Sequence, residues 1–300
     1  MQTLWFGAIL TAEERGDGMG EKKLFCQRGK LCYQISLCKE YLLRDLHDLF
    51  SGERFAASSE EEPLPFLVQA HRSLLRRRLE GVDMSLQEGK IRNLGLALPH
   101  LHTLLIRPGE TFSFWRRVGR CTAAGGYQPG LTITCGGHGS AVGGGLCQLA
   151  NMVHWLVLHS ELEVTELHHH TDALFPDSGR RVPFGTGTSI FYKNVDYRFQ
   201  NRTEDTYQLL LWLDETDLCG ELRCSAPPRY RYRMEEREHH FQREGDGFYY
   251  RVSQVWRRQY DRASGNFLRE DKILQNHSRV LYDPALIPPE QIRQEGEVTE

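Results

Sequence analysis

Residues Val142–His159 read VGGGLCQLANMVHWLVLH, so a run of glycines passes directly into an apolar periodic segment. The periodic part places its apolar side chains at Leu149, Met152, Val153, Leu156 and Val157. Spacings of three and four residues are those of one helix face. The sequence therefore predicts a helix over Leu146–His159 that is buried on one side, with a glycine-rich turn leading into it.

Cys147 would lie in the first turn of that helix, directly after Gly143, Gly144 and Gly145. The free N–H groups and the positive end of the helix dipole lower the pKa of a thiol and favour the reactive thiolate. The same N–H groups could hold an oxyanion, with the amide of Gln148 as an additional donor. The pattern is typical of a nucleophile at a loop-to-helix turn.

A cysteine nucleophile needs a base, and histidines occur on both sides of Cys147. His138 precedes it within the glycine-rich loop. His168 and His170 follow it at the end of an expected strand over Val164–Leu167, and would point the same way on an extended chain. One of these imidazoles could face the thiol while Asp172 orients it, as in a Cys-His-Asp arrangement.

Two other interpretations of these residues stay open. Cys147 could be a small buried hydrophobic residue without a chemical role. His168 and His170 could bind zinc together with Cys147, because imidazole and thiolate are ligands that zinc favours. The chain has no CxxC pair of the kind that builds zinc knuckles. Apart from this zinc alternative, we expect no cofactor.

The remaining periodicity predicts an α+β fold. Helices are expected over Tyr41–Phe50, Phe66–Glu80 and Leu86–Leu98, and Phe112, Phe114 and Trp115 form an aromatic cluster. After Val164 the chain is rich in alternating segments that predict a largely antiparallel sheet. These segments are Ser189–Gln200, Tyr207–Asp214, Leu218–Cys224, Tyr230–Glu236, Phe248–Arg257 and Ile273–Tyr282. We expect an N-terminal extension over 1–62, a central domain over 63–226 and a β-rich C-terminal region over 227–300, which could be continuous with the central domain.

Composition excludes some classes of function. The net charge of −3, from 37 basic and 40 acidic residues, argues against a nucleic-acid partner, because phosphate binding needs a basic excess. No stretch approaches the ~20 apolar residues of a membrane-spanning helix, and the first ten residues lack a basic export signal. We therefore expect a soluble, cytoplasmic protein whose eight cysteines are free thiols. Cys26, Cys32 and Cys38 recur every six residues, which would put them on one face of a strand.

Several of these segments together resemble the VanW family, over roughly residues 64–224. The segments that carry the resemblance are Leu105–Trp115 (LIRPGETFSFW), Val118-Gly119, Gly126-Tyr127, Val142–Gln148 (VGGGLCQ), His168–Asp172, Phe175–Asp177 and Tyr197–Thr203 (YRFQNRT). The chain looks like the short form of the family. It departs from the family pattern at Ala150 and Asn151, where many members carry Ser or Thr, which weakens a role for a hydroxyl at that point.

The resemblance implies an association with glycopeptide resistance and leaves two hypotheses. In the first, Cys147 attacks an acyl or peptide carbonyl of a cell-wall peptide or its precursor, and a histidine acts as base. In the second, the protein does not catalyse a reaction. The glycine-rich loop and the aromatic cluster around Trp115 would then hold a wall-related ligand or a partner protein.

Overall fold

The computed structural model describes residues 24–76, 83–134, 137–169, 172–173, 176 and 181–293, without the side chains of residues 27, 133, 134, 137 and 138. The chain divides into two units, Met1–Ser51 and Gly52–Glu300. Few helices and many strands make the fold α+β, with most helix in the first half and antiparallel sheets later, as predicted. Among the described residues, no helix combines the length and the hydropathy that crossing a membrane requires.

The described residues of the first unit form a short 3-10 helix, η1 (Phe25–Arg28), and helix α2 (Lys30–Phe50). The expected strand with three aligned cysteines is wrong, because Cys26 lies in η1 while Cys32 and Cys38 lie on α2. The apolar residues around them recur at helical spacing, at Leu31, Ile35, Leu42, Leu46 and Leu49. A six-residue step does not return to the same face of a helix, so the even cysteine spacing carries no structural meaning.

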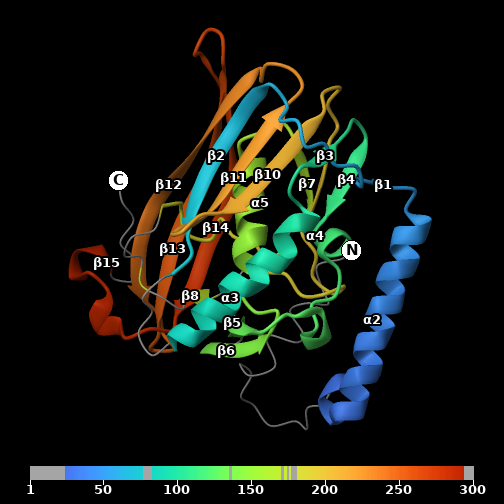
Figure 1. Cartoon of the computed structure of the whole chain (residues 1–300). Helices are drawn as coiled ribbons and strands as arrows, with labels where there is room; N and C mark the ends of the chain where they lie inside the picture. Colours follow the sequence, from blue (N-terminus) through green and yellow to red (C-terminus); the bar gives the residue numbers. More distant parts are fainter. Residues whose placement is uncertain are drawn as a thin grey trace. The chain divides into compact units, whose positions relative to one another are not determined.

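The second unit contains three sheets and a hairpin (Figure 1). The first sheet has the order β2-β11-β10-β3, the second β1-β4-β9-β7 and the third β15-β12-β13-β14-β8, while β5 and β6 pair in the hairpin. Their bounds are β1 Arg54–Phe55, β2 Phe66–Leu74, β3 Leu104–Ile106, β4 Glu110–Ser113, β5 Pro129–Thr134, β6 Gly137–Val142, β7 Glu163–Glu166, β8 Asp172–Ala173, β9 Arg198–Gln200, β10 Tyr207–Leu213, β11 Asp217–Cys224, β12 Tyr230–Arg243, β13 Tyr249–Asp261, β14 Phe267–Val280 and β15 Ile292–Arg293.

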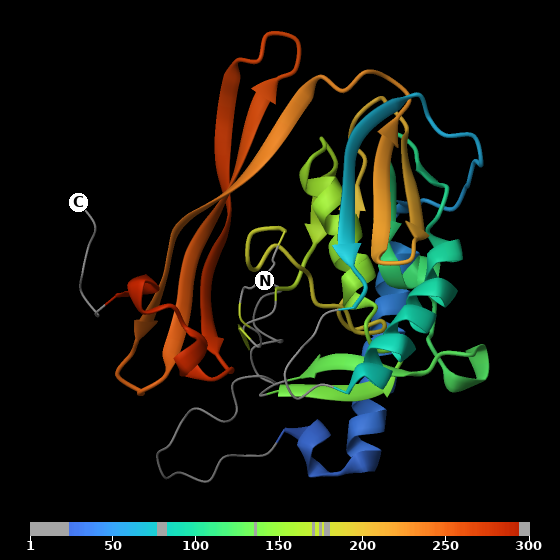
Figure 2. The same cartoon turned by 60° about the vertical axis from the view of Figure 1, so that its left-hand side comes forward.

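Three α-helices belong to this unit: α3 (Met84–Ala97), α4 (Phe114–Val118) and α5 (Cys147–Leu158). Short 3-10 turns complete it, namely η2 Leu98–His100, η3 Ala123–Gly125, η4 Pro284–Leu286 and η5 Pro289–Gln291. The predicted helices over Leu86–Leu98 and Leu146–His159 are confirmed as α3 and α5. Helix α5 lies between the first sheet and the long strands of the third (Figure 2), and it contacts β2 and β11 directly.

The predicted helix over Phe66–Glu80 is wrong. Residues Phe66–Leu74 form β2, which pairs antiparallel with β11 from Phe66 opposite Cys224 to Leu74 opposite Asp217. Leu, Gln, Ala and Arg favour helix locally, and the apolar spacing also fits a helix. The partner strand lies about 150 residues later in the chain, so the pairing that overrides this local preference cannot be seen in the segment itself.

Most of the predicted strands in the second half are confirmed, with shifted ends. Strands β12, β13 and β14 extend beyond the predicted segments, whereas only the last three residues of Ser189–Gln200 form β9. The main core gathers the apolar face of α5 with Phe112, Phe114 and Tyr197, which are all fully buried. Two residues of the aromatic cluster, Phe112 and Phe114, are therefore core residues.

Candidate functional site

Cys147 is the first residue of α5 and is only partly exposed. Burial raises the pKa of its thiol, while the backbone N–H groups of Ile190 and of Cys147 itself act in the opposite direction with smaller effect. This direction is opposite to the one expected from the helix end. Desolvation disfavours the thiolate more than the nearby N–H groups stabilise it.

The amide of Gln148 holds α5 against β2. Its nitrogen donates to the carbonyl oxygen of Leu74 at 2.8 Å and to the hydroxyl of Ser73 at 3.0 Å. An amide nitrogen carries two hydrogens, so these two bonds use its full donor capacity. The Gln148 amide, which the sequence suggested as an oxyanion donor, therefore joins α5 to β2.

The three glycines allow other parts of the chain to approach closely. Gly143 has φ of 80°, and a Cβ added there would lie 2.8 Å from the Cβ of Cys121. A Cβ on Gly144 would collide with the backbone of Gly130, and one on Gly145, where φ is 95°, would collide with the side chain of Lys90. Backbone conformation and packing both require glycine at this turn.

Two polar residues of α3 that sequence reasoning missed hold the glycine turn. Asn93 is fully buried and donates to the carbonyl oxygens of Gln128 and Gly144, both at 2.9 Å, while its own oxygen accepts from the N–H of Gln128 at 2.8 Å. Lys90 is also buried, and its ammonium donates to the carbonyl oxygen of Leu75. The sequence did contain a sign of their role, because Lys90 and Asn93 are two polar residues three positions apart, on one face of the predicted helix.

The histidines are distributed over different parts of the structure. The imidazole of His168 lies 3.4 Å from the carboxylate of Glu166. The backbone carbonyl oxygen of His168 accepts a hydrogen bond from the N–H of Ser189 at 2.6 Å. Asp172 lies in β8, opposite Arg279 of β14, so the structure places it on a different sheet from the strand that precedes His168.

His170 and the side chain of His138 lie outside the part of the chain that the structure describes. Within the described part, none of the hydrogen bonds joins an imidazole to Cys147. The expected zinc ligands include His170, so this set lies partly outside the described residues. The described residues contain no group of three or more His, Cys, Asp or Glu side chains arranged to hold a metal.

A buried charge network lies beneath Trp115, and sequence reasoning missed it. Asp196 accepts from the hydroxyl of Ser113 at 2.5 Å, from the N–H of Trp115 at 3.0 Å and from the guanidinium of Arg198 at 2.9 Å. Burial raises the pKa of Asp196, which these donors partly offset. Arg198 also approaches Glu166 at 3.5 Å, so the network reaches the carboxylate beside His168.

Trp115 is partly buried and uses its indole N–H to bond the carbonyl oxygen of Val195 at 2.9 Å. Its ring packs edge-on against Phe114 and Tyr192. Trp115 thus closes the aromatic core over the network around Asp196. The indole N–H of Trp115 has a hydrogen-bond partner within the protein, and part of the ring surface is exposed to solvent.

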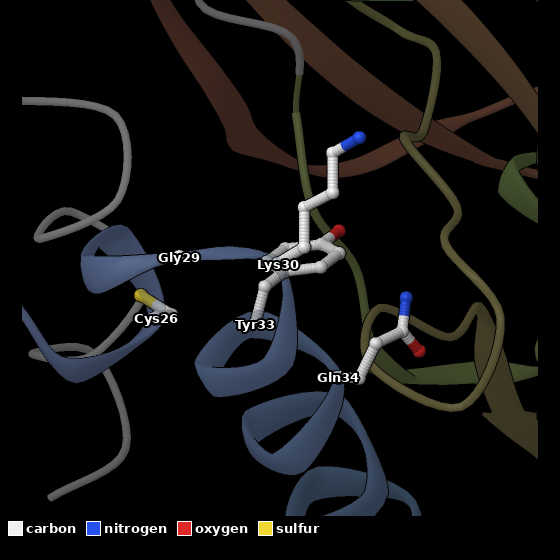
Figure 3. Close-up of a pocket in the computed structure, with 5 residues that line it drawn as sticks. All are labelled: Cys26, Gly29, Lys30, Tyr33 and Gln34. Carbon is white, nitrogen blue, oxygen red and sulfur yellow. The ribbon is translucent and has the colours of Figure 1, made fainter.

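The described part of the chain also contains surface hollows that other residues line. One, of about 320 Å³, belongs to the first unit, where Cys26 of η1 and Lys30, Tyr33 and Gln34 of α2 line it (Figure 3). The other, of about 470 Å³, belongs to the second unit and lies between the loop after α5 and the strands β12, β13 and β14.

Comparisons with known proteins identify relatives for most of the chain. A family model described as VanW like protein matches residues 89–223, which include the glycine turn, α5 and Asp196. The Vancomycin B-type resistance protein VanW of Enterococcus faecalis is 31% identical over 233 residues, covering 78% of this chain and 84% of that protein. The Uncharacterized protein YoaR of Bacillus subtilis is 29% identical over 118 residues, covering 39% and 37% respectively. No solved structure matches.

Proposed function

The chain belongs to the VanW family, and from this membership we propose that it is an accessory protein of vancomycin-type glycopeptide resistance that acts by binding. Its ligand is a cell-wall peptide or a precursor of one. Cys147 is a structural residue in this proposal, and no covalent intermediate forms on it. The proposal extends to this chain the resistance role that the name of its Enterococcus relative states.

The observation that carries the proposal is the engagement of the Gly143–Gln148 segment with the rest of the fold. Gln148 donates to β2, the carbonyl oxygen of Gly144 accepts from Asn93, and Gly145 packs against Lys90. A catalytic turn must instead present its donors to a reacting group. The raised pKa of Cys147 agrees with a structural role, because the thiolate is the nucleophilic form.

A cysteine-dependent acyl-transfer or hydrolytic enzyme is the second candidate. The N–H groups of Ile190 and Cys147 both face the thiol and favour its charged form. If an imidazole from His138, His168 or His170 approached this thiol, the same N–H groups would stabilise a thiolate. The two candidates therefore differ in the reactivity of one sulfur atom.

The pH dependence of alkylation at Cys147, followed by mass spectrometry, separates these candidates. Cys121 is the internal reference, because burial raises the pKa of its thiol as well, and Cys147→Ala identifies the signal. The binding proposal expects slow alkylation of Cys147 that accelerates only above the ordinary thiol pKa of about 8.5. Rapid alkylation near neutral pH that His168→Ala or His170→Ala slows would instead establish the enzyme.

A second experiment measures glycopeptide susceptibility in a host in which the protein changes that susceptibility. Cys147→Ser should leave that response unchanged if the protein acts by binding. Complete loss of the response, with the variant folded and present at the normal level, would contradict the proposal.

A further inference from the structure

The hollow in the second unit is formed where three neighbouring strands present polar side chains to the loop that follows α5. Tyr232 of β12, Gln259 of β13 and Arg269 of β14 are in register across the sheet. Glu161 and Arg257 line the same hollow. Strands β12, β13 and β14 run side by side in the third sheet (Figure 2). Its volume of about 470 Å³ lies within the range of small-molecule sites.

Arg257 lines this hollow and is partly buried. Its guanidinium stacks 3.9 Å from the centre of the Tyr232 ring and donates to the carbonyl oxygen of Ser160. Its Nε is buried and has no hydrogen-bond partner among the described residues. The carboxylates of Asp271 and Glu161 are near enough to interact with its charge. Desolvation lowers the pKa of this guanidinium. A cation in this situation is stabilised when an anion enters beside it.

Other donors line the same hollow. Arg269 is 65% exposed, and its Nε donates to the side-chain oxygen of Gln259 at 2.8 Å and lies 3.6 Å from the carboxylate of Asp271. Tyr230 and Tyr232 contribute two hydroxyl groups to the lining residues of the hollow. Two guanidinium groups and two hydroxyls are the set that recognises a carboxylate.

Glu161 is the acidic residue of the lining, which also contains two arginines, two tyrosines, Gln259 and Leu268. Burial raises the pKa of its carboxyl, and Arg229 and Arg257 act against that shift. A carboxylate beside two guanidinium groups disfavours a doubly charged phosphate and provides a partner for an ammonium group. The hollow therefore offers complementary charges for a small molecule that carries both signs.

We propose that this hollow binds a free amino acid or short peptide, with Arg257 and Arg269 holding the terminal carboxylate and Glu161 holding the amino group. The inference rests on the proposed binding function and names the ligand class and the site. It does not involve Cys147. The size of the hollow suits a molecule of about two residues.

An NMR titration of the full chain with the dipeptide Ala-Ala tests the proposal. N-acetyl-Ala-Ala and the C-terminal amide of Ala-Ala remove one ligand charge each. We expect the carboxylate-bearing compounds to bind and the amide to bind at least about tenfold more weakly, because a hydrogen-bonded charge pair is lost. Equal binding of all three compounds, or no binding of Ala-Ala at millimolar concentration, would overturn the proposal.

Variants on the same sheet locate the site. Arg269→Gln, at an exposed position, should weaken Ala-Ala binding about tenfold. Arg231→Gln is the matched control, because Arg231 lies between Tyr230 and Tyr232 on β12 and therefore points to the opposite face.

Glu161→Gln should weaken the binding of Ala-Ala and leave N-acetyl-Ala-Ala unaffected, because only the former has an ammonium group. Arg269→Gln without effect, or Arg231→Gln with the same effect, would refute the assigned site. The alkylation of Cys147 is measured separately, so a failure of this inference and a failure of the proposed binding function give different results.

Discussion

Lys90 shows at the scale of one residue why the turn before α5 is built from glycine. Its side chain fills the space that a Cβ on Gly145 would occupy. Gly109 has a similar positive φ, 77° against 95°, but nothing within 4 Å of its Cβ position. The two positions therefore separate backbone strain from steric overlap, and each contributes differently to the cost of a side chain.

We expect Gly109→Ala to lower the free energy of unfolding by about 1–2 kcal/mol, the cost of a left-handed conformation. Gly145→Ala should cost at least about 1 kcal/mol more, because the new methyl group also displaces Lys90. Urea unfolding followed by circular dichroism measures both. Equal losses in the two variants would show that the turn has room for a side chain and that packing against Lys90 does not require glycine.

Asn93 joins three segments by side-chain hydrogen bonds and is the next residue whose removal is informative. Asn93→Ala leaves two carbonyl oxygens and the N–H of Gln128 without their buried partner. We expect a loss of about 2–4 kcal/mol in the free energy of unfolding. Asn266→Ala, in an exposed hairpin turn, is the control and should change stability by less than about 0.5 kcal/mol. A small loss at Asn93 would mean that water replaces its bonds.

Helix α5 affects the pH dependence of stability, because it carries the buried His154 and is followed directly by the partly buried His159. Burial lowers the pKa of His154 to about 3 and that of His159 to about 4. The nearby charges of His169 and Arg257 also lower the pKa of His154. An unfolded chain binds a proton at each histidine below the ordinary pKa of about 6.5, whereas the folded chain does so only at much lower pH.

We therefore expect stability to fall as the pH decreases from about 6.5 towards 4, with no contribution from these groups above that window. His154→Gln should reduce the slope of unfolding free energy against pH by about 1.4 kcal/mol per pH unit, the value for one proton. His100→Gln, at an exposed position, is the control. An unchanged slope in His154→Gln would place the proton uptake at another group.

The comparison of α5 with β2 shows which elements a sequence can predict. All the apolar residues that define α5 lie within three turns of one another, so their spacing alone predicts the helix and its buried side. Strand β2 depends on β11 for its backbone hydrogen bonds, and its own composition favours helix. Local patterns thus predicted the helix that carries Cys147 and failed on the strand that receives Gln148.

In the candidate site, too, local features could be predicted and contacts with distant residues could not. The glycine turn and the position of Cys147 could be predicted because they are contiguous in the chain. The contacts that decide the environment of the thiol come from distant residues, since Ile190 faces the sulfur and Lys90 packs on the turn. The pKa of Cys147 depends on that burial, which no local motif encodes. Chemical reactivity was therefore the least predictable property of this segment.

The boundary at Gly52 has consequences for the whole molecule. Every buried apolar residue of the two core clusters lies at Ala56 or later, and α2 contains no fully buried residue. The residues just after the boundary are different. Arg54 and Phe55 form β1 and pair with Glu110 and Thr111 of β4, and Ala56 is 3% exposed. Because the core clusters contain no described residue before Ala56, we expect the core to form without the first unit.

A chain that begins at Gly52 should therefore fold and retain the Tm of the full chain to within about 3 °C, as measured by calorimetry. A chain that begins at Ala57 is the matched control, only five residues shorter. It loses β1 and the buried methyl group of Ala56, and its Tm should fall by about 5 °C or more, because an edge strand and a core contact are removed together. If the chain from Gly52 is instead as unstable as the control, residues before the boundary stabilise the second unit. The second unit would then need the residues before Gly52 in order to fold.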